Sequence, residues 1–369
     1  MNLSIGIVGL PNVGKSTLFN ALTKKSVPAE NYPFCTIDPS VGIIPVPDER
    51  LEKLNEFSKS KKKIPAVIEF VDIAGLVKGA SKGEGKGNAF LQHIRECDAI
   101  AEVVRIFEDQ NILHVEAEID PLRDIQIINL ELILKDLETV SKRLGSLEKD
   151  LKRGDKNAAL EGSGLQKVLK VLEDEKMAIT VFDELDEKEK PFVINSQLLT
   201  SKPILYVLNK KAGGKNLDHD TNTDERWTKL MKFFEENKAK YILVDANIEN
   251  ELKEFEGEEK ESFRKELGAN SDGVGNLIIS SYELLGLDTF FTTGEDETRG
   301  WTIKRNSTAP IAGTAIHTDF RDKFIRAEVI EWNKLLEVGS YASAREKGLL
   351  RTEGKEYVVK DGDVIEFKI

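Results

Sequence analysis

The chain has 369 residues, 40% of them hydrophobic and 32% charged, a balance typical of globular domains and not of a disordered chain. Its 53 basic and 65 acidic residues give a formal net charge of −12, which excludes a uniformly basic, nucleic-acid-binding surface. Cys35 and Cys97 are too few for a disulfide scaffold and no apolar run approaches the roughly 18 residues that span a bilayer, so we expect a cytoplasmic protein with no membrane contact.

Short apolar runs alternate with helical patterns, which predicts a parallel sheet flanked by crossover helices, because such runs bury both faces of each strand. The predicted strands cover residues 5–8, 67–71, 100–107, 203–208 and 241–244. We therefore expect a doubly wound α/β domain, built from residues 1–125 and 200–284.

The first predicted strand leads into the phosphate-loop motif G-x-x-x-x-G-K-[ST] at residues 9–16 (GLPNVGKS), and a helical run follows. Backbone amides of such a loop surround phosphate oxygens, and the N-terminus of the next helix adds partial positive charge. Lys15 is expected to neutralise β- and γ-phosphate charge, also during catalysis, and Ser16 to ligate Mg²⁺. The residues expected to bind the phosphates are Asn12, Val13, Gly14, Lys15, Ser16 and Thr17.

Two further segments fit the same metal and γ-phosphate. Asp72 opens a D-x-x-G tetrapeptide after a predicted strand, so its carboxylate can approach Mg²⁺, usually through water, while the Gly75 amide senses the γ-phosphate. Thr36 lies in a loop, residues 31–36, that we expect to order only with the triphosphate and to complete the Mg²⁺ shell. In isolation, Thr36 would be interpreted as an ordinary loop threonine.

Apolar residues at alternating spacings of three and four form a heptad seam over residues 130–151, and residues 165–172 begin a return path. This pattern predicts an inserted antiparallel helical hairpin, a coiled-coil domain over residues 126–199, that is either a partner-binding arm or a self-packed strut. The acidic-rich segments 183–190 and 249–266 are interpreted as solvated faces, and the lysines between 59 and 63 as a solvated loop.

The last domain is expected over residues 285–369, as a compact α+β module. Strands are predicted at residues 289–293 and 302–303, and a helix at 324–336. Residues 357–359 and 364–367 are predicted to form a hairpin around a turn at 360–363.

Longer motifs identify a family resemblance. Residues 72–80 and 83–91 resemble the glycine-rich second switch of the Obg-like P-loop NTPases, and residues 31–37, 107–115 and 120–124 closely resemble the YchF family, the Obg-like ATPases. The resemblance covers nearly the whole chain and includes a C-terminal module similar to a TGS domain, a ubiquitin-like β-grasp. It implies preference for ATP over GTP, association with ribosomes and a link to oxidative-stress control.

The base-binding motif departs from this pattern. GTPases read guanine with N-K-x-D, and the YchF family has N-x-x-E, whereas this chain has Asn209, Lys210, Lys211 and Ala212. Without a carboxylate at the fourth position, much of the guanine preference should be lost, because unpaired polar edges cost about 1–3 kcal/mol. Asn209, with the Lys210 stem over one base face, suits adenine or loose specificity; Asp245 is an alternative acceptor.

The catalytic group is less defined. Ras-like enzymes place a glutamine after D-x-x-G, but this chain has Leu76, which can neither donate nor accept a hydrogen bond. The family resemblance implies two substitutes, the side chain of His114 and a K⁺ ion held with the help of Asn12, whose charge would offset the transition-state anion. His114 as a solvent-exposed loop residue remains the alternative, and slow turnover is predicted either way.

The expected partners are ATP and a ribosome, either the large subunit or a 70S-type particle; no DNA is expected. Residues 299–326 contain six basic and two acidic residues around Trp301 and Phe320, a surface that could contact rRNA or simply carry mixed charge. A GTP-hydrolysing translation or assembly factor is one alternative function. A nucleotide-gated ribosome- or RNA-binding module with negligible turnover is another.

Overall fold

The computed structural model describes residues 3–23, 26, 38, 40–73, 86–109, 118–219, 224–255, 257–269 and 271–369. The chain divides into two compact units. One combines residues 4–21 with 71–274, and the other combines residues 1–3 and 22–70 with 275–369. The domain boundaries expected from the sequence stay a prediction.

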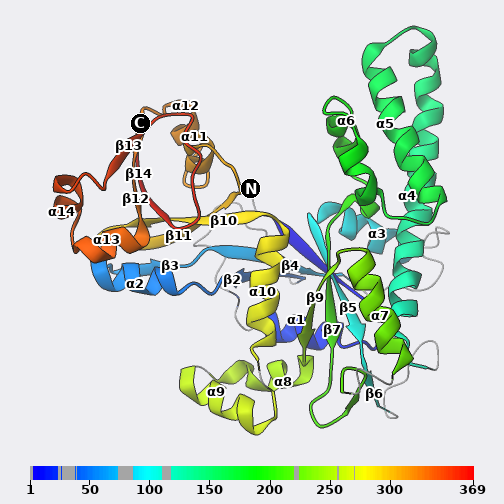
Figure 1. The fold of residues 1–369 in the computed structure, drawn as a ribbon, viewed down its shortest axis with the longest axis horizontal. Helices are drawn as coiled ribbons and strands as arrows, with labels where there is room; N and C mark the ends of the chain where they lie inside the picture. The colour runs from blue at the N-terminus through cyan, green and yellow to red at the C-terminus, as the bar shows by residue number, and fades with distance from the viewer. Residues whose placement is uncertain are drawn as a thin grey trace. The chain divides into compact units, whose positions relative to one another are not determined.

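The first unit is built on parallel strands in the order β1-β5-β7-β9 (Figure 1). These are β1 (Ser4–Val8), β5 (Ala99–Arg105), β7 (Ile204–Asn209) and β9 (Lys240–Val244). All seven residues of β5 are buried, as expected for a central parallel strand. β4 (Val67–Asp72) ends in this unit, where the Ile73 amide donates to the Ile7 carbonyl at 3.2 Å.

Helices follow the strands of this unit, which confirms the doubly wound α/β fold. They are α1 (Lys15–Thr23), α3 (Lys86–Glu96), α7 (Glu225–Glu236), α8 (Ala246–Glu251), α9 (Gly257–Glu266) and α10 (Gly273–Leu284), the last crossing into the second unit. On one face, Trp227 and Leu230 of α7 pack with Tyr206 and Leu208 of β7 in a buried cluster. A short antiparallel pair, β6 (Phe107–Glu108) with β8 (Lys215–Asn216), follows β5 and β7.

The predicted hairpin is present as a long arm. Helices α4 (Pro121–Lys152) and α5 (Lys156–Glu173) run side by side in Figure 1. A 3₁₀ turn at Ala178–Glu184, helix α6 (Lys190–Asn195) and a second 3₁₀ turn at Leu199–Ser201 follow in chain order. The seam residues Ile133, Val140 and Leu147 are buried against Leu165 and Val168 of the return helix. The ends of the seam, at residues 130 and 151, are exposed.

Within the arm, one acid departs from the expected solvated face. Glu189 is buried and accepts hydrogen bonds from the Ser163 hydroxyl at 2.6 Å, from Lys167 at 2.8 Å and from the Asp186 amide at 2.9 Å. In the second acidic segment, Glu249 and Arg264 are likewise buried as an ion pair. Alternation of acids and bases along the chain does not reveal such pairs, because their partners come from other helices.

The second unit contains a mixed sheet in the order β13-β12-β14-β10-β11-β3. Its strands are β3 (Lys62–Ile64), β10 (Leu287–Thr293), β11 (Glu297–Lys304), β12 (Arg326–Glu331), β13 (Arg351–Glu353) and β14 (Asp363–Lys368). β10 and β11 form a hairpin, and β14 runs parallel to β10, which is the strand arrangement of a β-grasp. The helices are α2 (Glu49–Ser58), α11 (Ala309–Gly313), α12 (Asp319–Asp322), α13 (Trp332–Val338) and α14 (Tyr341–Glu346). β2 (Val41–Pro45) pairs with β4.

Two sequence predictions in this unit are wrong, and a third is partly wrong. The helix predicted at 324–336 is instead β12 followed by α13, because Ala327 and Val329 alternate into the core while β12 pairs with β14. Residues 357–359 make only a bridge from Val358 to Thr308, and β14 pairs with β12 and β10 instead. The lysine-rich segment is solvated as predicted, but it is not all loop: it contains β3, whose backbone pairs with β11 while Lys62 and Lys63 stay exposed.

No helix formed by the described residues is long and apolar enough to cross a membrane.

Candidate nucleotide-binding site

The phosphate loop has the strand–loop–helix context that its sequence predicts. β1 ends at Val8 and α1 begins at Lys15, so the amides of the loop and first turn lie at the carboxyl end of the sheet. Gly14 has φ +96°, and a Cβ there would meet the side chain of Asn209. A Cβ at Gly9 would lie 2.7 Å from the Val103 carbonyl oxygen. Both glycines are therefore required by the path of the loop.

Lys15 and Asp72 are brought together. Lys15 Nζ lies 3.0 Å from Asp72 Oδ1, and the two side chains are 10% and 26% exposed. The pair joins the phosphate loop to the end of β4, 57 residues later in the chain. Ser16 and Thr17, in the first turn of α1, line the cavity that also borders Lys15 and is described below. A hydroxyl and a carboxylate are oxygen ligands of the kind that Mg²⁺ takes, so the residues present fit this ion.

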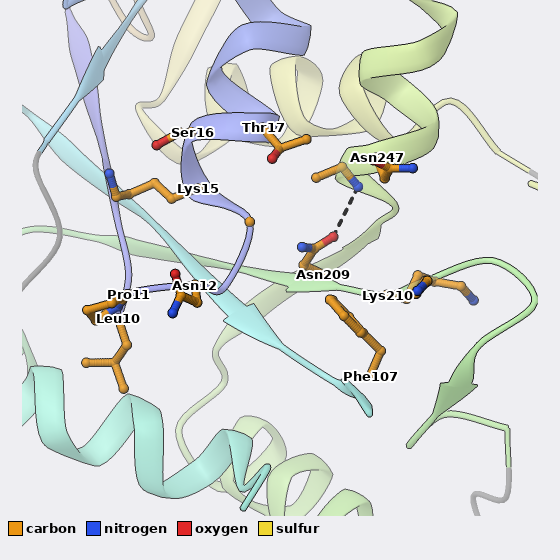
Figure 2. Close-up of a pocket in the computed structure, with 13 residues that line it drawn as sticks. Leu10, Pro11, Asn12, Lys15, Ser16, Thr17, Phe107, Asn209, Lys210 and Asn247 are labelled. Atoms are coloured by element: carbon orange, nitrogen blue, oxygen red, sulfur yellow. Dashed lines mark hydrogen bonds between the residues drawn. The ribbon is translucent and has the colours of Figure 1, made fainter. Parts of the chain in front are cut away.

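Asn209 lies where β7 ends and is held by two backbone groups. Its Nδ2 donates to the Val13 carbonyl at 2.8 Å, and its Oδ1 accepts from the Ala246 amide at 3.0 Å, the bond drawn in Figure 2. The side chain is buried. Asn209 therefore fastens the phosphate loop to the first residue of α8, and the buried amide has little freedom to turn.

Asp245, the alternative base acceptor, is already engaged. Its Oδ1 caps α8 by accepting from the Asn247 and Ile248 amides at 3.1 and 3.0 Å, and its Oδ2 accepts from the Ala212 amide at 2.6 Å. The Ala212 amide thus ties the loop between β7 and β8, residues 210–214, to the start of α8. We call residues 210–214 the base-side loop. Lys210 extends to Asp218, 3.0 Å away.

These elements surround a cavity of about 660 Å³. Figure 2 shows Lys15, Ser16 and Thr17 at one side of it and Phe107, Asn209 and Lys210 at the other. The lining residues are Leu10, Pro11, Asn12, Gly14, Lys15, Ser16, Thr17, Phe107, Asn209, Lys210, Lys211, Ala246 and Asn247. None of these described residues is acidic, and three are lysines, each of which pairs with an aspartate that does not line the cavity. The cavity therefore presents positive donors and no carboxylate to an anionic ligand. Its volume is typical of small-molecule sites.

The sequence assigned no site role to Phe107. The residue is 6% exposed and forms part of the cavity wall. The available signal was its position directly after a central parallel strand, since ligands of open α/β sheets bind at the carboxyl ends of the strands. Among the predicted site residues, Thr36, Gly75 and His114 lie outside the described residues. The described residues contain no cluster of three or more acidic, histidine or cysteine side chains that could hold a metal alone.

A parallel sheet whose first strand leads through G-x-x-x-x-G-K-[ST] into a helix, with a lysine–aspartate pair at the loop, defines a P-loop NTPase. Family models agree: residues 4–140 match MMR_HSR1, described as a 50S ribosome-binding GTPase. Residues 287–369 match YchF-GTPase_C, described as a protein of unknown function.

Full-length relatives identify the family. The chain is 52% identical over 368 residues to the ribosome-binding ATPase YchF of Bacillus subtilis, covering 100% of this chain and 99% of that protein. It is 41% identical over 370 residues to Obg-like ATPase 1 of Gallus gallus, covering 100% and 92%. The structure of the Schizosaccharomyces pombe YchF GTPase superposes with a TM-score of 0.85 at 38% identity, covering 100% and 98%. The chain belongs to the YchF family.

Proposed function

We propose that this protein binds Mg·ATP, hydrolyses it slowly and acts as a nucleotide switch on the ribosome, in translation or a stress response. The observation that carries the proposal is the cavity of three lysines and loop amides beside the Lys15–Asp72 pair. The names of the relatives, ribosome-binding ATPases, support the nucleotide and the partner. Such a role would place the protein in the cytoplasm.

In the proposed complex, loop amides and Lys15 bind the β- and γ-phosphates, and Ser16, Asp72 and Thr36 hold Mg²⁺ directly or through water. Bound Mg²⁺ supplies positive charge where phosphate charge builds up. Because Lys15 and Asp72 pair at 3.0 Å, the lysine must exchange its carboxylate partner for phosphate oxygens when nucleotide enters. The Gly75 amide would sense the γ-phosphate.

On the base side, Asn209 and Lys210 border the purine and Phe107 offers a ring face. The absence of an acid among the described lining residues removes the partner that guanine's N1–H and exocyclic amine require. This supports ATP over GTP. Two groups are candidates to replace the Ras-type glutamine in hydrolysis. The His114 side chain would position the attacking water, and a K⁺ ion held with Asn12 would offset the negative charge of the transition state.

Binding of Mg·ATP tests the central step. Lys15→Ala should lower Mg·ATP affinity by about tenfold or more, since it removes a charge-assisted contact to phosphate. Lys229→Ala, on the exposed face of α7, is the matched control and should bind like the unaltered chain. Calorimetric titration in K⁺ and in Na⁺ buffer, with ATP and GTP side by side, also tests base choice and cation dependence. Equal affinity of Lys15→Ala and the unaltered chain would contradict the proposal.

The remaining alternatives separate on turnover and sedimentation. If GTP binds more tightly than ATP, the protein is a GTPase factor, an alternative consistent with the S. pombe relative being called a GTPase. His114→Ala should abolish turnover and keep ATP affinity; a protein without measurable turnover would be a binding module instead. Co-sedimentation with ribosomes in the presence of ATP at moderate salt tests the partner, and separated subunits test which particle and rRNA it contacts.

A further inference from the structure

Arg105, the last residue of β5, is buried and holds the turn that carries Phe107. Its Nε donates to the Phe107 carbonyl at 3.0 Å and its Nη2 to the Asp109 carbonyl at 3.2 Å. The guanidinium carbon lies 4.5 Å from the centre of the Phe107 ring. The residue is only 1% exposed. One planar side chain therefore fixes both the backbone beyond β5 and the ring that it presents to the cavity.

The turn is joined to the base-side loop. The Ile106 amide donates to the Asn209 carbonyl at 3.0 Å, and Phe107 pairs with Asn216 in the β6–β8 ladder. Asp109, whose carbonyl Arg105 holds, binds Lys211 Nζ at 2.6 Å through its carboxylate. Lys211 and Phe107 both line the cavity. Arg105 therefore supports two lining residues, Phe107 by direct contact and Lys211 through Asp109.

Burial disfavours the charged guanidinium of Arg105, and two nearby carboxylates partly offset that cost. Burial lowers the pKa of Arg105, and the carboxylates of Asp109 and Asp124 act in the opposite direction. Asp124 is itself buried, in the first turn of α4. A buried cation near two acids, with directed donors, has a defined position, which a lysine's single ammonium would not reproduce.

We propose that Arg105 is a positioning residue for the purine base: it holds the Phe107 ring in the cavity wall so that the base can pack on it. Arg105 does not line the cavity with Lys15 and Ser16, so the phosphate tail should not depend on it. The proposal rests on the proposed function, because it presumes that a purine nucleotide is the ligand. It deepens that function by separating binding of the base from binding of the phosphates.

Two ligands separate these contributions: Mg·ATP, and inorganic tripolyphosphate with Mg²⁺, which has the phosphates and no base. Arg105→Lys keeps the charge and loses the planar fork. We expect its Mg·ATP affinity to fall about tenfold, as for loss of a base-stacking contact, while its tripolyphosphate affinity stays within about twofold. In turnover, KM for ATP should rise with little change in kcat. Arg143→Lys, at an Arg–Glu pair in the arm, is the matched control and should change neither affinity.

Phe107→Leu provides a second variant if Arg105→Lys folds poorly. It should lose ATP affinity and retain tripolyphosphate affinity, and the double variant should lose no more than the larger single loss, because Arg105 acts through the ring. Unchanged ATP affinity in Arg105→Lys, equal losses for both ligands, or additive losses in the double variant would overturn the inference. If the unaltered chain binds tripolyphosphate but shows no preference for ATP over it, the inference also fails. If the unaltered chain binds neither ligand, the proposed function itself fails.

Discussion

Gly14 shows how a single residue sets the shape of the phosphate loop. Its φ of +96° is unfavourable for any residue with a side chain, and an added Cβ would meet the Asn209 amide that holds the loop. We expect Gly14→Ala to lower Mg·ATP affinity about tenfold or more and to destabilise the fold by about 1–3 kcal/mol. Calorimetry and denaturant unfolding measure both.

Gly145 in α4 is the matched control, since a Cβ there would meet nothing within 4 Å and the residue lies inside a helix. Gly145→Ala should stabilise the protein by about 0.5–1 kcal/mol and leave nucleotide affinity unchanged. If both glycine variants bind Mg·ATP like the unaltered chain, the loop does not need the left-handed conformation.

Glu102, at the centre of β5, is a buried acid that the mechanism does not use. Neither carboxylate oxygen has a hydrogen-bond partner among the described residues, and burial, together with Asp124, raises its pKa well above the usual value. Because the unfolded chain ionises at lower pH than the folded one, the carboxyl costs stability increasingly as pH rises above its unfolded pKa of about 4.5. Glu102→Gln should therefore stabilise the protein by about 1 kcal/mol or more at pH 7.

The gain should shrink as pH falls toward 4, where the unfolded glutamate also takes up its proton. Urea unfolding at several pH values checks both the sign and this slope. A gain that is independent of pH would show that the effect of the substitution is packing and not ionisation.

At the scale of elements, the arm contains a buried acid, Glu189, whose pKa is lowered and not raised. Lys167, the Ser163 hydroxyl and the Asp186 amide lower the pKa of Glu189 to about 2. A lowered pKa stabilises the fold above the unfolded value of about 4.5, and this stability is lost as pH falls from there toward 2. Glu189→Gln should destabilise the arm by about 1–3 kcal/mol at neutral pH.

The difference between Glu189→Gln and the unaltered chain should fade as the solution is acidified, the reverse of the pattern expected for a raised pKa. Circular dichroism of the helices during urea unfolding follows the arm. Glu187→Gln, an exposed acid three residues before Lys190, is the control and should change stability by less than about 0.5 kcal/mol.

Elements are predictable where local pattern and burial agree. The strands before the phosphate loop and before Asn209 are continuous apolar runs, and the arm follows a strict heptad, so each pattern has one interpretation. The apolar residues at 324–336 also fit a period of 3.6, so they predict one helix where the structure has β12 and α13. Residues 326–331 form a strand because they pair with β14, a distant contact that the local pattern does not contain. In the same way, the lysine-rich segment forms β3 because it pairs with β11, which its sequence alone does not indicate.

The same reason limits prediction of the site. The phosphate loop and Asp72 are encoded by contiguous motifs, and their proximity follows from adjacent strand ends. Arg105 contacts the carbonyls of Phe107 and Asp109, which are close in sequence. Its effect on the site depends on the contacts of those two residues with β8 and Lys211, about 100 residues away, which no local pattern specifies. Ala212 illustrates the converse: the sequence shows a missing acid, and only the structure shows its amide on Asp245.

At the scale of the molecule, the second unit unites segments from both ends of the chain. Arg50 of α2 binds Asp48 at 2.7 Å and Asp361, in the turn before β14, at 2.5 Å, and Asp361 also accepts from the Thr289 amide at 2.8 Å. Leu51 and Leu54 of α2 pack with Phe291 and other residues of the C-terminal module. Residues 40–70, which lie between the phosphate loop and Asp72 in sequence, are therefore folded together with a module more than 200 residues away.

Replacing Arg50 should separate the stability of this unit from nucleotide binding. Arg50→Ala removes a partly buried guanidinium from two carboxylates, so we expect a loss of about 1–3 kcal/mol in the second unit. Hydrogen exchange should quicken in β3, β10 and the turn at 360–363, while ATP still protects the phosphate loop. Glu56→Ala, an exposed acid on the same helix, should change neither. If Arg50→Ala weakens Mg·ATP binding as much as it destabilises the C-terminal strands, the stability of the second unit and nucleotide binding are coupled. Because a ligand stabilises only the state that it binds, Mg·ATP would then stabilise both units together.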